Sequence, residues 1–328
     1  MDKAAEKKEK DKIKRQQARW SKMLAGMDEL SLWLHDLLRV GLISLPDRSR
    51  RYWDDMDKRL IDAQAPGLAA MVRTLRDLPY KEGTEWQQQA VDIIGKMWMI
   101  IRGFSKMYEL PEPQQADLKA LAGWGAGPKE VLNDPNALSI KDNWLVAGRS
   151  TELIDDITTQ RNWLLGLHTG HFALILQFAF KNMPIESNFA PGNAYTMDLA
   201  FFPSATPLRA VVREQGKVVS SEHSLSPFPN WAAVEADRAV QLAINPLLDQ
   251  FPVFVAQITP FFEHSRAFLF DIDQKVIPLE TQTDPLPFLR LMAISGGQPL
   301  DVLLLVTGTG TSVLGCLQDG KYMLILST

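Results

Sequence analysis

The sequence predicts an α+β protein, with a helical, bundle-like N-terminal domain followed by a mostly antiparallel α+β domain. Between about residues 20 and 110, apolar side chains recur every three or four positions, which is the spacing of amphipathic helices. After about residue 140, short apolar runs alternate with turn dipeptides, which is typical of strands and hairpins. These strands do not alternate regularly with helices, so a doubly wound parallel sheet is disfavoured.

The first expected helix begins at Trp20 and ends before Pro46. Apolar residues three or four positions apart form a stripe along this helix, and we expect the stripe to face inward. It consists of Trp20, Met23, Met27, Leu30, Leu34 and Leu37. Residues 1–19 precede it as a charged arm, for which the composition leaves a solvated helix and a disordered segment both open.

Three further helices are expected before the first boundary. The second buries Trp53, Met56 and Leu60, and the third begins at Pro66, a residue favoured in a first helical turn. Thr84 with Gln87 has the spacing of a capping box for the fourth helix. That helix ends near Pro111.

A Gly- and Pro-rich stretch at residues 111–140 contains the predicted domain boundary. We therefore assign residues 20–122 to the helical domain, 123–140 to a linker and 141–328 to the α+β domain.

Strands in the second half are predicted from five apolar runs: residues 172–180, 208–212, 266–272, 301–306 and 322–326. Three dipeptides have the composition of hairpin turns: Thr169-Gly170, Gln215-Gly216 and Asp319-Gly320. One helix is expected in this half. Asn230 caps it, and one face carries Ala232, Ala236, Ala239, Ala243 and Leu247.

Charge and cysteine content limit the classes of function. The net charge is −4, yet residues 1–22 hold nine Lys/Arg and four Asp/Glu. The single cysteine, Cys316, forms no internal disulfide and no Cys-based zinc site. No signal peptide and no run of about 18 apolar residues is present. The sequence therefore predicts a cytoplasmic protein that does not contact a membrane.

His168 and His171 are the weak candidates for a metal site. If Thr169-Gly170 is a two-residue turn, the two imidazoles face each other across the strand ends. A stable site requires a third or fourth ligand, which the nearby sequence does not supply. A solvated polar turn is the favoured interpretation, and no metal or other cofactor is expected.

Other groups with catalytic residue types have structural interpretations. Glu152, Asp155 and Asp156 mark a turn between the strands around Trp144 and Trp163. The Thr- and Gly-rich stretch at 307–312 lacks the lysine of a phosphate-binding loop and is followed by a strand pattern, so we expect a hairpin loop. No catalytic residue is assigned, which favours a non-enzymatic protein and leaves an enzyme open.

Two segments carry a family resemblance: ELSLWLHDLLRVGLISL (29–45) and YWDDMDKRLIDAQAPGLA (52–69). They resemble bacterial SWIM zinc-finger family proteins, as do, in the same order, residues 144–146, 160–166, 200–204, 207–210 and 291–299. The family's CxC…CxH finger is expected before residues 1–19. It is absent from this sequence, so its zinc ligands are not carried over.

The resemblance implies a non-enzymatic interaction or accessory protein working with a MoxR-type AAA ATPase and a von Willebrand A-domain protein. No catalytic residues are assigned to the family's body region, so the resemblance implies none here. Aromatic residues dominate interface hot spots, so Trp33 and Trp98 are candidate anchors. Two alternatives remain: an enzyme or metal-binding protein with a site in the α+β domain, and a nucleic-acid-associated protein acting through the basic arm. Acidic residues in the arm, and the lack of aromatics before Trp20, make nucleic acid the unlikely partner.

Overall fold

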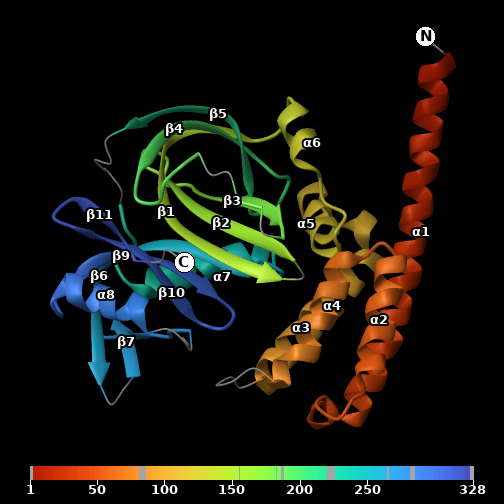
Figure 1. Ribbon diagram of the computed structural model, residues 1–328, viewed down its shortest axis with the longest axis horizontal. Coiled ribbons are helices and arrows are strands. Elements are labelled where there is room, and N and C mark those ends of the chain that lie inside the picture. The colour runs from red at the N-terminus through yellow and green to blue at the C-terminus, as the bar shows by residue number, and fades with distance from the viewer. Residues whose placement is uncertain are drawn as a thin grey trace. The chain divides into compact units, whose positions relative to one another are not determined.

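The computed structural model divides the chain into two compact units, Met1–Ala126 and Gly127–Thr328, called here the helical unit and the β unit (Figure 1). The structure describes residues 3–80, 86–154, 156–181, 183–185, 188–219, 226–263, 266–280 and 285–325. Helices followed by two mostly antiparallel sheets confirm the predicted α+β class. Among the described helices, none has the length and apolar content needed to cross a membrane.

Five α-helices and three 3-10 turns occur among the described residues of the helical unit. They are α1 (Lys3–Val40), η1 (Leu42–Ser44), α2 (Arg50–Asp62), α3 (Pro66–Asp77), η2 (Leu78–Tyr80), α4 (Trp86–Ser105), η3 (Met107–Glu109) and α5 (Glu112–Ala122). The α1 stripe from Met23 to Leu37 is buried as predicted. Residues 3–19 of the arm are helical and form the first part of α1. Thr84 lies outside the described residues, so its capping role stays a prediction.

Helix α5 occupies part of the stretch that composition marked as a boundary. Pro111 precedes its first turn, and Gly123 ends it in the left-handed conformation with φ 93°, so the same Pro and Gly that suggest a loop delimit a helix. Two glycines allow α5 to pack closely. A Cβ on Gly103 would lie 2.8 Å from the Leu118 side chain, and one on Gly67 would lie 1.9 Å from the Leu121 carbonyl oxygen.

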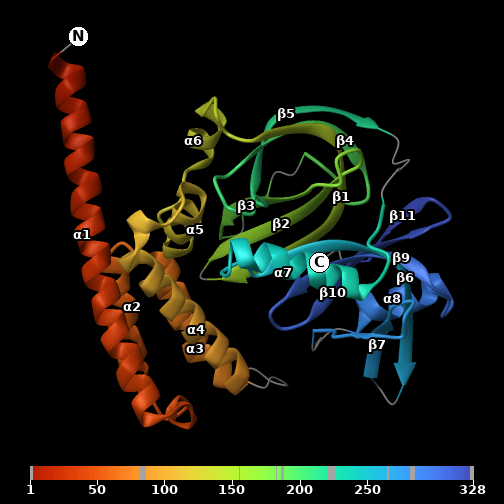
Figure 2. The same cartoon turned by 180° about the vertical axis from the view of Figure 1, so that it is seen from behind.

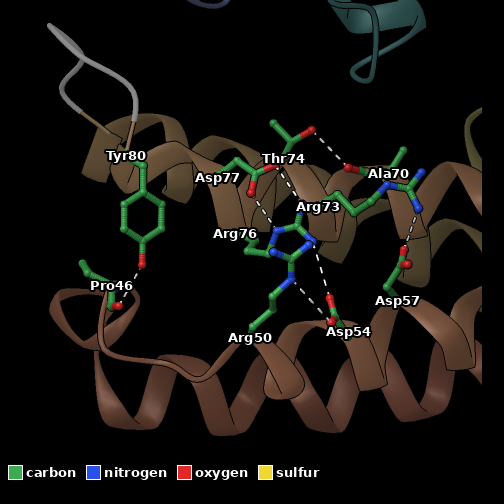
Figure 3. Close-up of polar contacts among 10 residues, drawn as sticks. All are labelled: Pro46, Arg50, Asp54, Asp57, Ala70, Arg73, Thr74, Arg76, Asp77 and Tyr80. Atoms are coloured by element: carbon green, nitrogen blue, oxygen red, sulfur yellow. Dashed lines mark hydrogen bonds and ion pairs between the residues drawn. The ribbon is translucent and has the colours of Figure 1, made fainter. Parts of the chain in front are cut away.

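Ion pairs connect α2 to α3 (Figure 3). Arg73 Nη1 lies 2.7 Å from Asp57 Oδ1, and Arg76 Nη1 lies 3.5 Å from Asp54 Oδ1. Arg76 also donates two hydrogen bonds to Asp77, which raise the pKa of its guanidinium. These contacts link α2 and α3 at the surface, whereas Trp53, Leu60 and Leu75 of the same helices are buried.

The β unit, over the residues that the structure describes, contains two antiparallel sheets and three helices. The five-stranded sheet has the order β3-β2-β1-β4-β5 and contains β1 (Ser139–Ile154), β2 (Ile157–Gly166), β3 (Phe172–Phe180), β4 (Ala194–Phe201) and β5 (Ala210–Val219). The six-stranded sheet has the order β11-β10-β9-β6-β7-β8 and contains β6 (Gln250–Glu263), β7 (Arg266–Phe270), β8 (Val276–Ile277), β9 (Leu300–Thr307), β10 (Thr311–Gln318) and β11 (Lys321–Leu324). The helices are α6 (Pro128–Asn133), α7 (Trp231–Ile244) and α8 (Leu286–Ser295).

The five-stranded sheet curves strongly, as Figure 2 shows. Its two edges meet where Leu174 N–H donates to the Leu208 carbonyl at 2.8 Å. The two sheets share a core in which Trp163 of β2 packs with Leu303 and Leu314 of the other sheet. Helices α7 and α8 cover the opposite face of the six-stranded sheet through residues such as Trp231.

Tyr322 joins the two sheets by a buried hydrogen bond from its hydroxyl to the Ala147 carbonyl. Ala147 lies in a β-bulge between Val146 and Gly148, where a residue leaves the regular ladder and its backbone groups need other partners. Tyr322→Phe should lower the free energy of unfolding of the β unit by about 1–2 kcal/mol, because a buried acceptor loses its donor. Urea unfolding measures this loss. Tyr108→Phe, at an 84% exposed tyrosine, is the control and should be neutral.

Of the hairpin turns predicted at Gln215-Gly216 and Asp319-Gly320, one is confirmed and one is wrong. Asp319-Gly320 is a two-residue turn with φ 50° and 74°, as predicted. The predicted turn at Gln215-Gly216 is wrong, because both residues lie within β5. A Cβ on Gly216 would lie 3.1 Å from the Thr196 carbonyl oxygen, at an irregularity of the β4–β5 ladder. A lone glycine inside a strand often marks such a site.

The single helix expected in the second half is α7, and its cap is confirmed, since Asn230 Oδ1 accepts from Ala233 N–H at 3.0 Å. Its alanine face is exposed, whereas Trp231 and Val234 are buried. Two helices were not predicted, α6 and α8. Both begin at or next to prolines, Pro128 and Pro285, which composition alone assigns to loops.

Candidate functional site

An apolar groove between α1 and α4 is the candidate interaction site of the helical unit. Its volume is about 330 Å³. The α1 wall is formed by Leu34, His35 and Leu38, and the α4 wall by Val91, Ile94, Gly95 and Trp98. We call this site the α1/α4 groove.

Helical spacing explains why these side chains converge. Leu34 and Leu38 lie one turn apart on α1, and Val91, Gly95 and Trp98 lie at i, i+4 and i+7 on α4, so each set forms one ridge. Gly95 leaves the groove open, because a Cβ there would meet nothing within 4 Å.

Exposure distinguishes the α1/α4 groove from the core beneath it. Leu38 is 51% exposed, Val91 49% and Trp98 36%. The His35 ring meets Trp98 edge-on, with ring centroids 5.2 Å apart. Three large apolar side chains therefore remain half exposed side by side on one surface.

The two aromatic anchor candidates have different environments. Trp98 is on the surface, as the hypothesis requires. Trp33 packs instead between α1 and α2, stacked on Tyr52 at 5.2 Å and edge-on to Trp53 at 5.5 Å. Because these contacts occupy its ring, Trp33 is a packing residue within the helical unit.

His168 is paired with Asp142, which sequence reasoning did not identify. His168 Nδ1 lies 2.8 Å from Asp142 Oδ1, and the Asp142 carboxylate is fully buried while the imidazole is largely exposed. The carboxylate also accepts hydrogen bonds from Thr169 N–H (2.8 Å), Thr169 Oγ1 (2.7 Å), Asn143 N–H (2.6 Å) and His168 N–H (3.2 Å). Asp142 thus holds the β2–β3 turn.

The geometry expected for His168 and His171 differs from the structure. The connection runs over residues 167–171, so Thr169-Gly170 is not a two-residue hairpin turn, and Gly166 N–H donates to the His171 carbonyl at 2.8 Å. No group of three or more His, Cys, Asp or Glu side chains suited to a metal occurs in the part of the chain that the structure describes. Asp142, His168 and Thr169 form a turn-stabilising cluster with one exposed imidazole.

The acidic group near residue 155 belongs to the β1–β2 hairpin. Glu152 pairs with Arg161 on the neighbouring strand at 2.9 Å. Asp156 adopts φ 64° in the turn. Asp155 lies outside the described residues. The predicted turn between the Trp144 and Trp163 strands is confirmed.

The Thr- and Gly-rich stretch joins β9 to β10 as a hairpin loop, as expected. The hydroxyls of Thr307 and Thr309 lie 2.7 and 3.2 Å from Glu280 Oε1. The Glu280 carboxylate therefore accepts hydrogen bonds from the hydroxyl groups of this loop, and its negative charge opposes phosphate binding there.

A polar pocket of about 640 Å³ lies in the β unit near the start of β9 and the end of β10, with Asp301 and Asp319 in its lining. Asp301 Oδ1 accepts from Gln257 N–H at 3.1 Å, at a β6 irregularity where Gln257 has φ 51°. Cys316 is buried nearby in the core, and burial raises the pKa of its thiol to about 11, so it is protonated and unreactive at neutral pH.

Comparison with known proteins identifies one region. Residues 18–122 match the family model described as a SWIM-associated four-helix bundle domain. The matched segment ends with the last residue of α5. No curated protein and no solved structure matches the chain. The match agrees with the resemblance carried by residues 29–45 and 52–69 and supports a SWIM-related family for this chain.

Proposed function

We propose that this protein is a non-enzymatic interaction protein whose helical unit receives an amphipathic helix of a partner protein in the α1/α4 groove. One observation carries the proposal: Leu38, Val91 and Trp98 are half exposed along one groove with almost no polar lining. A SWIM-associated bundle in this unit is consistent with an accessory or interaction role.

A helix is the occupant that the groove favours. Its walls are two ridges from neighbouring helices, each with apolar residues one turn apart. A third helix bearing apolar residues at i, i+3 or i+4 and i+7 interdigitates with such ridges. Burying three half-exposed side chains would supply several kcal/mol of hydrophobic stabilisation.

The choice of partner in this proposal rests on the family resemblance. In this proposal the helix belongs to a MoxR-type AAA ATPase or to the von Willebrand A-domain protein of the same system, and the chain acts in the cytoplasm as their accessory protein. The bacterial origin of such systems is part of the same proposal.

The test compares two leucine substitutions on α1. Leu38→Lys places a charge in the α1/α4 groove, whereas Leu32→Lys, at a side chain that is 68% exposed and outside the groove lining, is the matched control. Each tagged protein is purified from its source cells under native conditions, and co-purifying proteins are quantified by mass spectrometry.

We expect the wild type and Leu32→Lys to retain an AAA ATPase or a von Willebrand A-domain protein. The amount of this partner recovered with Leu38→Lys should be about tenfold lower, since burying an unpaired charge is costly. Equal recovery with all three proteins contradicts the groove as the site. Recovery of the chain alone contradicts the accessory role. A dimer of the chain that Leu38→Lys dissociates assigns the groove to self-association instead.

A further inference from the structure

A second pocket of the helical unit, the aromatic pocket, lies where α1, η3 and α5 meet. Its volume is about 250 Å³. Trp20, Tyr108 and Trp124 supply its aromatic walls. The remainder of the lining consists of Gln16, Gln17, Met107, Gln115 and Lys119. Trp20 precedes Tyr108 by 88 residues and Trp124 by 104 residues, so only the packing of the helical unit brings the three rings together.

The rings are arranged around an open space. The Trp20 centroid lies 6.0 Å from that of Tyr108 and 6.1 Å from that of Trp124, with interplanar angles of 55° and 49°. Phe104 supports Trp20 from the core at 5.5 Å. Tyr108 is 84% exposed. An exposed ring beside two partly buried indoles offers stacking surface that the helical unit itself leaves unused.

Basic side chains lie at this surface, among them Lys119 in the pocket lining. Residues 11–22 contain five Lys/Arg and one Asp. Arg19 holds its guanidinium 4.9 Å from the centre of the Trp124 ring. Among the described ion pairs of the molecule, none involves Lys14, Lys22 or Lys119.

The charge of the whole chain conceals this local excess. The helical unit carries 22 Lys/Arg and 19 Asp/Glu, a net charge of +3, and the β unit carries 13 and 20, a net charge of −7. The overall −4 is therefore a property of the β unit, and it does not describe the environment of the aromatic pocket.

We propose that the aromatic pocket binds single-stranded nucleic acid. One or two bases stack on the Trp20 and Tyr108 rings, and the phosphates follow Lys119 and the exposed basic residues of α1. Stacking platforms beside a basic track are the general solution for binding single strands without sequence preference. The amides of Gln16 and Gln17 provide both donors and acceptors for base edges.

Other ligand classes fit the aromatic pocket less well. A cationic ligand of the kind held by aromatic cages is opposed by Lys119 in the lining and by Arg19 on the Trp124 ring. An apolar peptide would bury the amides of Gln16 and Gln17 without partners. A duplex keeps its bases inside the helix and offers no free ring face to Tyr108.

The structure places aromatic side chains beside the basic arm, where the sequence alone shows none. No aromatic residue precedes Trp20 in the basic arm, and nucleic acid is therefore disfavoured from sequence. Tyr108 and Trp124 remove that objection because tertiary packing places them against Trp20. The inference uses a surface separate from the α1/α4 groove and does not depend on the proposed function.

The test measures binding of a short fluorescein-labelled oligothymidylate to the full chain by fluorescence anisotropy. Tyr108→Ala is compared with Tyr80→Ala, which removes a 69% exposed tyrosine outside the aromatic pocket. We expect Tyr108→Ala to weaken binding about tenfold, since one base–aromatic stack is worth roughly 1–3 kcal/mol, and Tyr80→Ala to leave it unchanged. Lys119→Gln should reduce the slope of log K against log salt by about 0.7.

Competition completes the experiment. An unlabelled oligouridylate and an unlabelled oligothymidylate rank RNA against DNA, and a duplex of the same length should compete poorly. Three results overturn the proposal: no binding at about 50 mM salt, equal competition by the duplex, or wild-type affinity in Tyr108→Ala. The last two would assign any binding to the charge of α1 alone.

Discussion

Gly67→Ala should destabilise the helical unit by about 3 kcal/mol. A Cβ at this position would lie 1.9 Å from the Leu121 carbonyl oxygen and 2.9 Å from the carbonyl carbons of Leu121 and Ala122. All three atoms belong to the backbone of α5, so no side chain can rotate away, and α3 and α5 must separate. Overpacking of this kind costs about 1–3 kcal/mol. We expect a cost near the upper limit of this range for Gly67→Ala, because the clashing atoms belong to the backbone.

Gly95→Ala is the matched control for this prediction. Gly95 is also a helical glycine, but a Cβ there meets nothing within 4 Å, so alanine should stabilise α4 by about 1 kcal/mol through its higher helix propensity. Thermal unfolding, followed by circular dichroism at the helical band, measures both effects. The unfolding midpoint should be lower than that of the wild type by roughly 10 °C for Gly67→Ala and higher for Gly95→Ala. Similar midpoints for the two variants would contradict the close packing of α3 and α5.

The α3–α5 contact also shows where sequence reasoning succeeds and where it stops. The α1 stripe was predictable because Met23 to Leu37 repeat with helical periodicity and all face one core. α5 has only Leu118 and Ala122 buried, which is too short an apolar pattern to outweigh its flanking prolines and glycines. Its position depends on Gly67 and Gly103, whose role as contact points exists only once the helices are packed.

Turn prediction fails for a related reason. Asp319-Gly320 was correct because both residues tolerate the left-handed backbone that a tight hairpin requires. Gln215-Gly216 has a similar composition, yet its glycine serves the approach of the Thr196 carbonyl on a neighbouring strand. A local dipeptide does not distinguish these two uses of glycine, because the second is defined by a residue twenty positions away.

The candidate sites show the same division. Trp98 was identified correctly as a surface aromatic, whereas Trp33 was not, since Tyr52 and Trp53 cover it from another helix. The sequence predicts His171 as the partner of His168, but the partner in the structure is Asp142. Asp142 precedes His168 by 26 residues, and only the β1–β2 register, in which Trp144 pairs with Gly166, brings the carboxylate beneath the turn.

Asp142→Asn should destabilise the β unit by roughly 3 kcal/mol at neutral pH. Asp142 Oδ2 accepts from both Thr169 N–H and Thr169 Oγ1, and either orientation of the asparagine amide leaves donors facing an NH2 group in a fully buried position. Hydrogen bonds to a buried charged group are worth about 1.5–3 kcal/mol, and an unsatisfied donor adds its own cost. Glu152→Gln, at the half-exposed Arg161 pair, is the control and should change stability by less than about 1 kcal/mol.

The pH dependence gives Asp142→Asn a second, independent signature. Burial of the carboxyl acts to raise its pKa, but hydrogen bonds from Thr169, His168 and Asn143 outweigh burial, and the pKa of Asp142 lies below its ordinary value in the folded protein. A depressed folded pKa contributes stability that is fully present above the unfolded pKa of about 3.9 and is lost as the pH falls through the folded value. The difference in unfolding free energy between wild type and Asp142→Asn should therefore be present at pH 5 and above and shrink below about pH 4. Urea titrations across this range, with hydrogen exchange reporting on residues 167–171, measure it. A difference that stays the same at pH 3 would show that Asp142 stabilises the turn by shape and not by its charge.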